Sequence, residues 1–315
     1  MPELSAAVVG AGRLGTFHVE KYRATPGLHL KYVVDIDRDR AERVAAGSGA
    51  SVLGDYRELA GKVDLVSVAT PSLTHFRVAS DLLAAGIDVL VEKPMTATLE
   101  EAHELAAIAE RSGRILQVGH LERFNPAIVR LRSILRAPRF IECHRLAPFT
   151  ERGTDVDVIF DLMTHDLDVI LSLCATEIAS VEAIGVAVLT DRIDVANARI
   201  RFADGMIANL NTSRVAAKRE RKIRFFQPDA YISVDYEART LQVYRKSPPA
   251  PGGQYPVISA ERVELDSGDP LGDEIGSFVA SVRARTAPAV SARDGLRVIE
   301  VCERINAAMR AEARI

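Results

Sequence analysis

Two hydrophobic patterns divide the chain near residue 121. Before that point, short apolar runs typical of buried strands alternate with segments of helical periodicity. The strand-like runs are "AAVV", "LHLKYVVDID", "VDLVSVAT", "IDVLVEKPM" and "RILQVGH". Alternating strands and helices predict a parallel sheet with helices on both of its faces.

The helical segments of this first part carry start and stop signals. "PSLTHFRVASDLLAAG" ends at Gly86, and "TLEEAHELAAIAERSG" ends at Gly113, in the position where helices commonly end with glycine. Thr98 and Glu101 have the spacing of a capping box at the start of the second helix.

After residue 121 the pattern becomes rich in strands. The segments "RFIECHRLAPF", "ASVEAIGVAVL", "VANARIRFADGMIANLNTSR", "KIRFFQPDAYISVDY" and "TLQVYRK" follow one another with short connections. Asp204-Gly205 is a hairpin signal, "SPPAPGGQYP" reads as a loop, and two helical segments close the chain. We therefore expect an α/β protein with a parallel-sheet domain over residues 1–121. An α+β domain over residues 122–315 would contain a large, mainly antiparallel open sheet.

Composition narrows the class of protein. A chain of 315 residues is too long for one ordinary core, and 48% hydrophobic with 26% charged residues is typical of a globular protein. The net charge of −3 gives no reason to expect a nucleic acid or membrane surface as partner, and no apolar stretch approaches the roughly 18–20 residues of a membrane span. Three widely spaced cysteines argue against disulfides and metal clusters. With no signal-peptide pattern at the N-terminus, we expect a cytoplasmic protein without a metal.

The first strand leads into a glycine motif. Gly10, Gly12 and Gly15 have G-x-G-x-x-G spacing before a helical pattern, which suits a pyrophosphate at a helix N-terminus. Asp35 ends the next strand about twenty residues later, where an acid hydrogen-bonds the adenosine ribose. An acid there favours NAD over NADP, although Arg38 and Arg40 moderate the preference. The alternative is that Asp35 only caps the following helix.

These features predict a Rossmann domain whose ligand lies beyond the carboxyl ends of the strands. The candidate cofactor-binding residues are Gly10, Gly12, Arg13, Leu14, Gly15, Asp35, Ile36, Thr70, Pro71, His75, Glu92 and Lys93. Pro94 biases Lys93 away from the helical region, so we expect Lys93 at the end of its strand, near the nicotinamide. An ordinary surface lysine is the alternative.

The stretch "VIFDLMTHDLDVI" combines acids and a histidine with apolar residues. Asp161 and His165 are four apart and would share one face of a helix. Either they are half of an acid–base device, or they are a capping acid and a buried neutral histidine. Asp166 and Asp168 are interpreted either as charges beside a helix that carries functional residues, or as surface or capping residues.

The glycine motif, the tripeptide Glu92-Lys93-Pro94 and the later Asp161-x-x-x-His165 resemble the Gfo/Idh/MocA oxidoreductase family along essentially the whole chain. The resemblance implies a catalytic triad of Lys93, Asp161 and His165. Its chemistry suits an alcohol dehydrogenation, in which His165 takes a hydroxyl proton, Asp161 orients the imidazole and Lys93 stabilises the reacting oxygen.

We expect a small-molecule substrate, and a polyol or sugar would need polar groups around it. The candidate substrate-binding residues are Arg123, Asn125, Arg152, His165 and Arg214. The stretch 214–224 holds an excess of positive charge. It belongs either to a solvated face or subunit contact, or to a site for a phosphorylated substrate, since arginine suits phosphate recognition.

Within the family, "GHLERFNPA", "VLTDRIDVANARI" and "FQPDAYISVDY" are most similar to the branch of bacterial UDP-N-acetylglucosamine 3-dehydrogenases. That resemblance implies NAD-dependent oxidation of the sugar C3 hydroxyl, which feeds synthesis of the 3-amino sugar of lipid A. Two alternatives stand beside it: a dehydrogenase of a free sugar, polyol or inositol, and a non-catalytic cofactor-binding regulator. We also expect a homodimer or homotetramer formed through the C-terminal sheet, because one face of an antiparallel sheet without helices needs burial.

Overall fold

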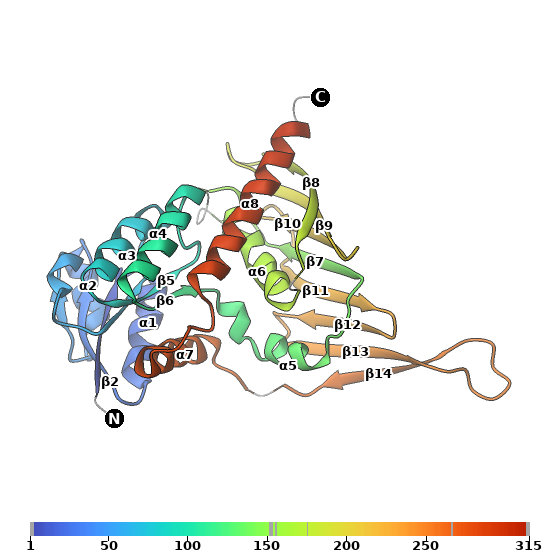
Figure 1. Ribbon diagram of the computed structural model, residues 1–315, viewed down its shortest axis with the longest axis horizontal. Coiled ribbons are helices and arrows are strands. Elements are labelled where there is room, and N and C mark those ends of the chain that lie inside the picture. The colour runs from blue at the N-terminus through green and yellow to red at the C-terminus, as the bar shows by residue number, and fades with distance from the viewer. Residues whose placement is uncertain (1–2, 151–153, 155, 175, 266, 313–315) are drawn as a thin grey trace. The chain divides into compact units, whose positions relative to one another are not determined.

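The computed structural model describes residues 3–150, 154, 156–174, 176–265 and 267–312. The chain forms two compact units (Figure 1). The first consists of Met1–Leu121 with Asp269–Ile299, and the second of Glu122–Gly268 with Glu300–Ile315. The sequence interpretation assigned residues 269–299 to the second domain, but they pack in the first, because their apolar side chains complete its core.

In its described residues, the first unit contains a six-stranded parallel sheet in the order β3-β2-β1-β4-β5-β6. The strands are β1 (Leu4–Val9), β2 (Leu28–Val34), β3 (Ser51–Leu53), β4 (Leu65–Val68), β5 (Asp88–Glu92) and β6 (Leu116–Gly119). All residues of β4, β5 and β6 are buried, as expected for a sheet covered on both faces. The predicted parallel sheet is confirmed, but the short β3 was not predicted, since three residues carry no pattern.

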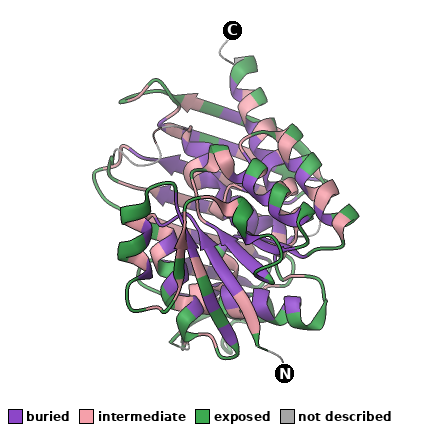
Figure 2. Ribbon diagram, turned by 90° about the vertical axis from the view of Figure 1, so that its left-hand side faces the viewer, coloured by how far each residue is buried: buried purple, intermediate pink, exposed green. Residues whose placement is uncertain are grey.

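Helices cover this sheet, and their buried positions alternate with exposed ones (Figure 2). They are α1 (Arg13–Ala24), α2 (Arg38–Ala45), α3 (His75–Ala84), α4 (Leu99–Ser112) and α7 (Pro270–Ala284), with 3-10 turns at Tyr56–Leu59 and Ser72–Thr74. The predicted ends are confirmed: Thr98 caps α4, Gly113 follows it in the left-handed conformation, and Gly86 follows α3 with φ of +80°.

The second unit is built on a mainly antiparallel sheet, which confirms the predicted class. Over the ranges the structure describes, it has eight strands in the order β14-β13-β12-β11-β7-β10-β9-β8. They are β7 (Phe140–Leu146), β8 (Ile178–Val186), β9 (Val195–Phe202), β10 (Ile207–Ser213), β11 (Glu220–Gln227), β12 (Ala230–Asp235), β13 (Thr240–Ser247) and β14 (Val257–Val263). Only the β7–β10 pair among these strands is parallel. Gly205, with φ of +85°, turns β9 into β10 at the predicted hairpin.

The two faces of this sheet differ in burial. Along β7 the residues Ile141, Cys143 and Arg145 are buried, whereas the alternating residues are only half-buried. The half-buried face carries a row of aromatic rings from four neighbouring strands, with centroids 5.0–5.5 Å apart. The row consists of Phe140, Phe226, Tyr231 and Tyr244.

The helical elements of the second unit are short, apart from the last. They are a 3-10 turn (Leu121–Phe124), α5 (Pro126–Ile134), a π-helical turn (Ile159–Met163), α6 (Thr164–Leu173) and the end of α8 (Ala292–Glu312), which contributes residues to both units. In the part of the chain that the structure describes, no helix is long and apolar enough to cross a membrane.

Candidate active site

Gly10, Gly12 and Gly15 form the turn between β1 and α1. Gly10 has φ of +99°, and a Cβ there would collide with the carbonyl group of Ala69. A Cβ on Gly15 would overlap the Gly10 carbonyl oxygen, so only glycine lets α1 approach the turn. Gly12 is the N-cap of α1, and the space where its Cβ would lie is open. The N–H groups at the start of α1 are therefore not covered by a side chain at Gly12, and such a helix N-terminus suits an anionic group such as a pyrophosphate.

Asp35, directly after β2, is tied to this turn. Its carboxylate accepts hydrogen bonds from the N–H groups of Ala11 (2.7 Å) and Asp37 (2.9 Å) and from the Arg40 guanidinium (2.8 Å). Burial raises the pKa of Asp35, but these hydrogen bonds outweigh burial and the pKa lies below its ordinary value. Asp35 does not cap α2, because that role belongs to Asp37, which accepts the Arg40 N–H.

Three other residues were predicted to bind the cofactor: Arg13 and Leu14 next to the glycine turn, and Ile36 next to Asp35. Arg13 and Leu14 are the first residues of α1. Ile36 follows Asp35 and is 94% exposed, which is unusual for a large apolar side chain. Its side chain offers an apolar surface beside Asp35, and such a surface suits the face of an adenine ring.

His75 is buried at the start of α3. Its Nδ1 lies 2.8 Å from the Pro94 carbonyl oxygen, and its Nε2 lies 2.9 Å from that of Thr70. Burial lowers the pKa of His75 and outweighs both carbonyls, and a neutral imidazole donates from one nitrogen at a time. His75 therefore connects the turn after β4, which includes half-buried Thr70 and exposed Pro71, with the turn after β5. Its ring nitrogens face the protein's own carbonyls.

Glu92 is the last residue of β5 and is held by a buried polar chain. It lies 2.9 Å from His18 Nε2; His18 Nδ1 lies 2.9 Å from the Ser67 hydroxyl, which lies 2.6 Å from the Tyr22 hydroxyl. Burial raises the pKa of Glu92, but His18 and Lys93 lower it more, so the carboxylate is ionised. Glu92 also accepts the N–H of Lys93 at 3.3 Å. This chain fixes the backbone that carries Lys93 to the carboxyl edge of the sheet, next to a cis peptide bond with Pro94.

Asp161 and His165 lie in the second unit. The sequence interpretation put both on one α-helix, but Asp161 lies in the π-helical turn Ile159–Met163 and His165 in the first turn of α6. Both are half-buried. Single π-turns within helices occur frequently at functional sites, where they change the direction of a side chain. Asp161 and His165 are therefore one helical turn apart, as expected, but the turn at Asp161 is π-helical and so wider than an α-helical turn.

Two buried ion pairs hold α6. Asp166, next to His165, receives two hydrogen bonds of 2.9 Å from Arg145 of β7. Asp168 receives three from Arg123, between 2.7 and 3.0 Å. All four side chains are at most 8% exposed. Asp166 and Asp168 are therefore neither surface nor capping residues, since a buried carboxylate needs a paired cation.

The predicted substrate-binding residues have other contacts in the second unit. Besides Arg123, Asn125 caps α5 by accepting the Ala127 N–H at 3.0 Å. Arg214 is buried, donates to the Val156 carbonyl at 2.7 Å and lies 3.6 Å from Asp194. Arg152 lies outside the described residues. The structure thus gathers Asp161 and His165 in the second unit, while Lys93 and the cofactor candidates belong to the first.

Within the described residues, no three His, Cys, Asp or Glu side chains are grouped as a metal site requires. The glycine turn and the acid after β2 are the features of a dinucleotide-binding domain. Lys93 follows β5 in the same unit, and the Asp161–His165 pair lies in the other unit.

Comparison with known proteins identifies the family. Residues 4–120 match the oxidoreductase family with an NAD-binding Rossmann fold, and residues 127–233 match the GFO/IDH/MocA C-terminal domain. The UDP-N-acetylglucosamine 3-dehydrogenase of Acidithiobacillus ferrooxidans is 38% identical over 99% of both chains, and its structure matches with a TM-score of 0.91. An inositol 2-dehydrogenase of Saccharopolyspora erythraea is 35% identical over 57% of this chain and 56% of its own.

The chain belongs to the GFO/IDH/MocA oxidoreductase family. It is an enzyme that uses NAD to oxidise a CH–OH group. A scyllo-inositol dehydrogenase of Lactobacillus casei, solved with NAD(H), shares the fold with a TM-score of 0.80 and 18% identity, covering 98% of this chain and 97% of its own.

Proposed function

We propose that this enzyme oxidises the C3 hydroxyl of UDP-N-acetylglucosamine to the 3-keto sugar. The observation that carries the proposal is similarity along the full length, at 38% identity over 99% of the chain, to an enzyme named for that reaction. The chain also has the lysine, aspartate and histidine that the chemistry requires.

In the proposed reaction His165 accepts the proton of the C3 hydroxyl, since imidazole titrates near neutral pH. Asp161, one helical turn earlier, orients the ring and stabilises its protonated form. Lys93 donates a hydrogen bond to the same oxygen and stabilises the negative charge that develops there. The glycine turn and Asp35 would hold NAD, which would accept the hydride that leaves C3. The products are the 3-ketone, NADH and a proton on His165.

Thermal stabilisation by ligands tests the substrate, because a ligand that binds only the native state raises the melting temperature. With NAD saturating, we expect UDP and UDP-N-acetylglucosamine to stabilise the protein, and inositol and glucose to have no effect. UDP-N-acetylglucosamine should then drive NADH production, followed by absorbance. Stabilisation by a free polyol alone, with NADH formed from it, would refute the nucleotide-sugar substrate and favour the second candidate, to which the inositol 2-dehydrogenase relatives point.

We further propose that Asp35 selects NAD. Asp35→Ala is expected to weaken NAD binding relative to NADP binding by about tenfold, because the carboxylate that accepts a ribose hydroxyl is lost and Arg40 becomes available to a 2′-phosphate. Dissociation constants for both dinucleotides, measured by calorimetry, give the ratio. Asp39→Ala, an exposed acid on α2, is the matched control. Equal weakening of both dinucleotides would mean that Asp35 is only structural.

The proposed cellular setting follows from the same substrate. The 3-keto sugar would be the precursor of a 3-amino sugar for lipid A, made in the cytoplasm, where unpaired cysteines are expected.

The half-buried sheet face with its aromatic row supports assembly into a homodimer or homotetramer, since these aromatic rings lose exposure when a second copy covers them.

A further inference from the structure

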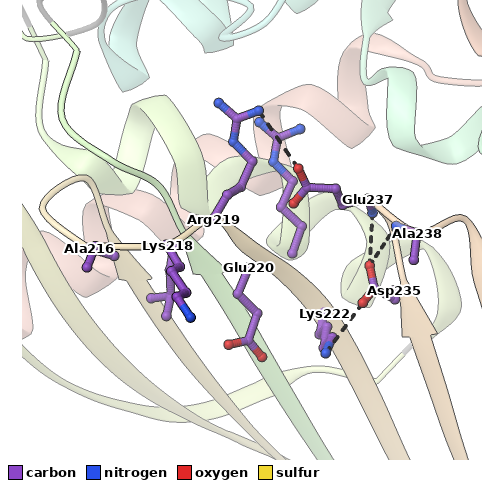
Figure 3. A pocket seen from close by; sticks show the side chains of 11 residues that line it. Ala216, Lys218, Arg219, Glu220, Lys222, Asp235, Glu237 and Ala238 are labelled. Atoms are coloured by element: carbon purple, nitrogen blue, oxygen red, sulfur yellow. Dashed lines mark hydrogen bonds and ion pairs between the residues drawn. The ribbon is translucent and has the colours of Figure 1, made fainter.

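The positive residues of the stretch 214–224 have very different partners. Arg224 lies 2.9 Å from Glu142, Lys222 lies 3.4 Å from Asp235, and Arg214 is held as described above. Arg219 lies 4.0 Å from Glu237, and a dashed line marks this pair in Figure 3. Most of the charge that the sequence displays is therefore compensated within the chain.

Arg221 is different. It is half-buried on β11, yet its guanidinium donates no hydrogen bond and forms no ion pair with any of the residues described. Burial and the neighbouring Arg145 lower the pKa of Arg221, and they outweigh the more distant acids Glu122 and Glu237, which raise it. The buried guanidinium of Arg145, by contrast, has Asp166 as its carboxylate partner. An unpaired, partly desolvated guanidinium is costly unless a ligand pairs with it.

The position of Arg221 relates it to the proposed base. Arg221 is paired in register with Arg145 of β7, so both side chains project from the same face of the sheet. Arg145 binds Asp166, the residue directly after His165. An anion at Arg221 would therefore lie on the face of the sheet on which α6 is anchored, beside the strand that holds the His165 helix.

A groove of about 630 Å³ opens at this point. It is lined by Leu146 of β7, the segment before β11, the start of β11 and the chain at and just after the end of β12. Lys218 and Arg219 are labelled in Figure 3, and Arg221 belongs to the same lining. Lys218 is exposed and, like Arg221, forms no ion pair within the described chain. Three acids also line the groove. Asp235 pairs with Lys222, Glu237 with Arg219, and Glu220 with Arg224 outside the groove. Arg221 and Lys218 are therefore the cations of the groove that make no ion-pair contact within the described chain.

We propose that Arg221, with Lys218 at its rim, binds a phosphate group of the substrate in this groove. This inference rests on the proposed function, and it assigns the diphosphate of the nucleotide sugar to a place in the fold. Guanidinium binds phosphate oxygens through two parallel hydrogen bonds, and the lysine adds a point charge. Binding replaces the missing partner of Arg221, so the pairing contributes affinity that a free polyol cannot obtain.

Two substitutions at Arg221 and one control test the site. Arg221→Gln removes the charge, and Arg221→Lys keeps it but removes the paired donors. Arg245→Gln, at an exposed position of β13, is the matched control. The probes are inorganic pyrophosphate, UDP and UDP-N-acetylglucosamine, titrated by calorimetry into full-length protein with NAD saturating, so that the glycine turn is filled. Circular dichroism melting verifies that each variant is folded.

We expect Arg221→Gln to weaken pyrophosphate and UDP binding by about 10- to 100-fold, and Arg221→Lys to weaken both by a smaller factor. The KM for UDP-N-acetylglucosamine should rise by a similar factor with kcat little changed, because the lost contact is remote from the reacting carbon. Arg245→Gln should bind all probes like the original protein.

The outcomes separate this site from the proposed function. If the enzyme oxidises UDP-N-acetylglucosamine and Arg221→Gln keeps its KM and UDP affinity, the phosphate site is wrong and the function stands. If pyrophosphate binding depends on Arg221 but no UDP-sugar is oxidised, the phosphate site stands and the proposed substrate is wrong. A protein that binds neither pyrophosphate nor UDP overturns the site.

Discussion

Replacing His165 by alanine is expected to lower kcat by about 10²- to 10⁴-fold, the usual contribution of a positioned general base. NAD affinity should change by less than about twofold, since the residues predicted to hold NAD belong to the other compact unit. Single-turnover measurement of NADH formation separates the chemical step from product release, and calorimetry gives the NAD affinity.

Lys93→Ala should reduce kcat to a comparable degree through loss of oxyanion stabilisation. Lys93→Arg should recover part of the rate, because the positive charge remains. His144→Ala is the control for loss of a histidine. His144 lies on the half-buried face of β7, opposite the face that carries Arg145. A near-normal kcat for either alanine variant would remove that residue from the proposed mechanism.

Replacing Asp166 by alanine is expected to lower the free energy of unfolding by about 3–5 kcal/mol, because the buried Arg145 guanidinium loses both of its hydrogen bonds to a carboxylate and keeps only the more distant Glu122, 3.6 Å away. Glu142 lies on the same strand as Arg145, and its pair with Arg224 is more exposed. Glu142→Ala should therefore lower the free energy of unfolding by less than about 1 kcal/mol. Urea denaturation followed by circular dichroism measures both. Equal effects would mean that burial does not govern the Arg145 pair.

The double variant Arg145→Met/Asp166→Leu is a second check of the same pair. An apolar pair of similar volume should restore most of the stability, because neither charge is then left buried alone. If the double variant were as unstable as Asp166→Ala, the loss would come from packing and not from the unpaired charge.

Much of the fold could be predicted because its signals are local. Gly10 and Gly15 are required by close backbone approach, Gly113 by a left-handed cap and Gly205 by a hairpin turn, and each sequence signal was confirmed. β14 was not predicted because six of its seven residues are exposed, so it lacks the alternation that marks a half-buried strand. The π-helical turn at Asp161 was not predicted either, since its composition does not differ from that of an α-helix.

The side-chain partners could not be predicted, because pairing depends on tertiary contacts. Nothing local marks Arg145 as the partner of Asp166, although an arginine at a buried position of β7 could have signalled the need for a carboxylate. For the same reason the sequence favoured Arg214 as a substrate residue and could not separate it from Arg221. Strand register, which puts Arg221 beside Arg145, distinguishes the two.

The path of the chain through the first unit has a consequence for its synthesis. Ile275, Phe278 and Val279 of α7 belong to the same core cluster as Tyr22 of α1 and Leu30 of β2. Figure 1 shows α7 beside α1. A nascent chain that has just passed residue 121 therefore lacks part of this core. At a synthesis rate of roughly 5–20 residues per second, the ribosome completes α7 only about 10–30 s later. During that interval the emerging Rossmann strands expose an apolar surface that a chaperone can bind, and fragments that stop before residue 269 are expected to aggregate.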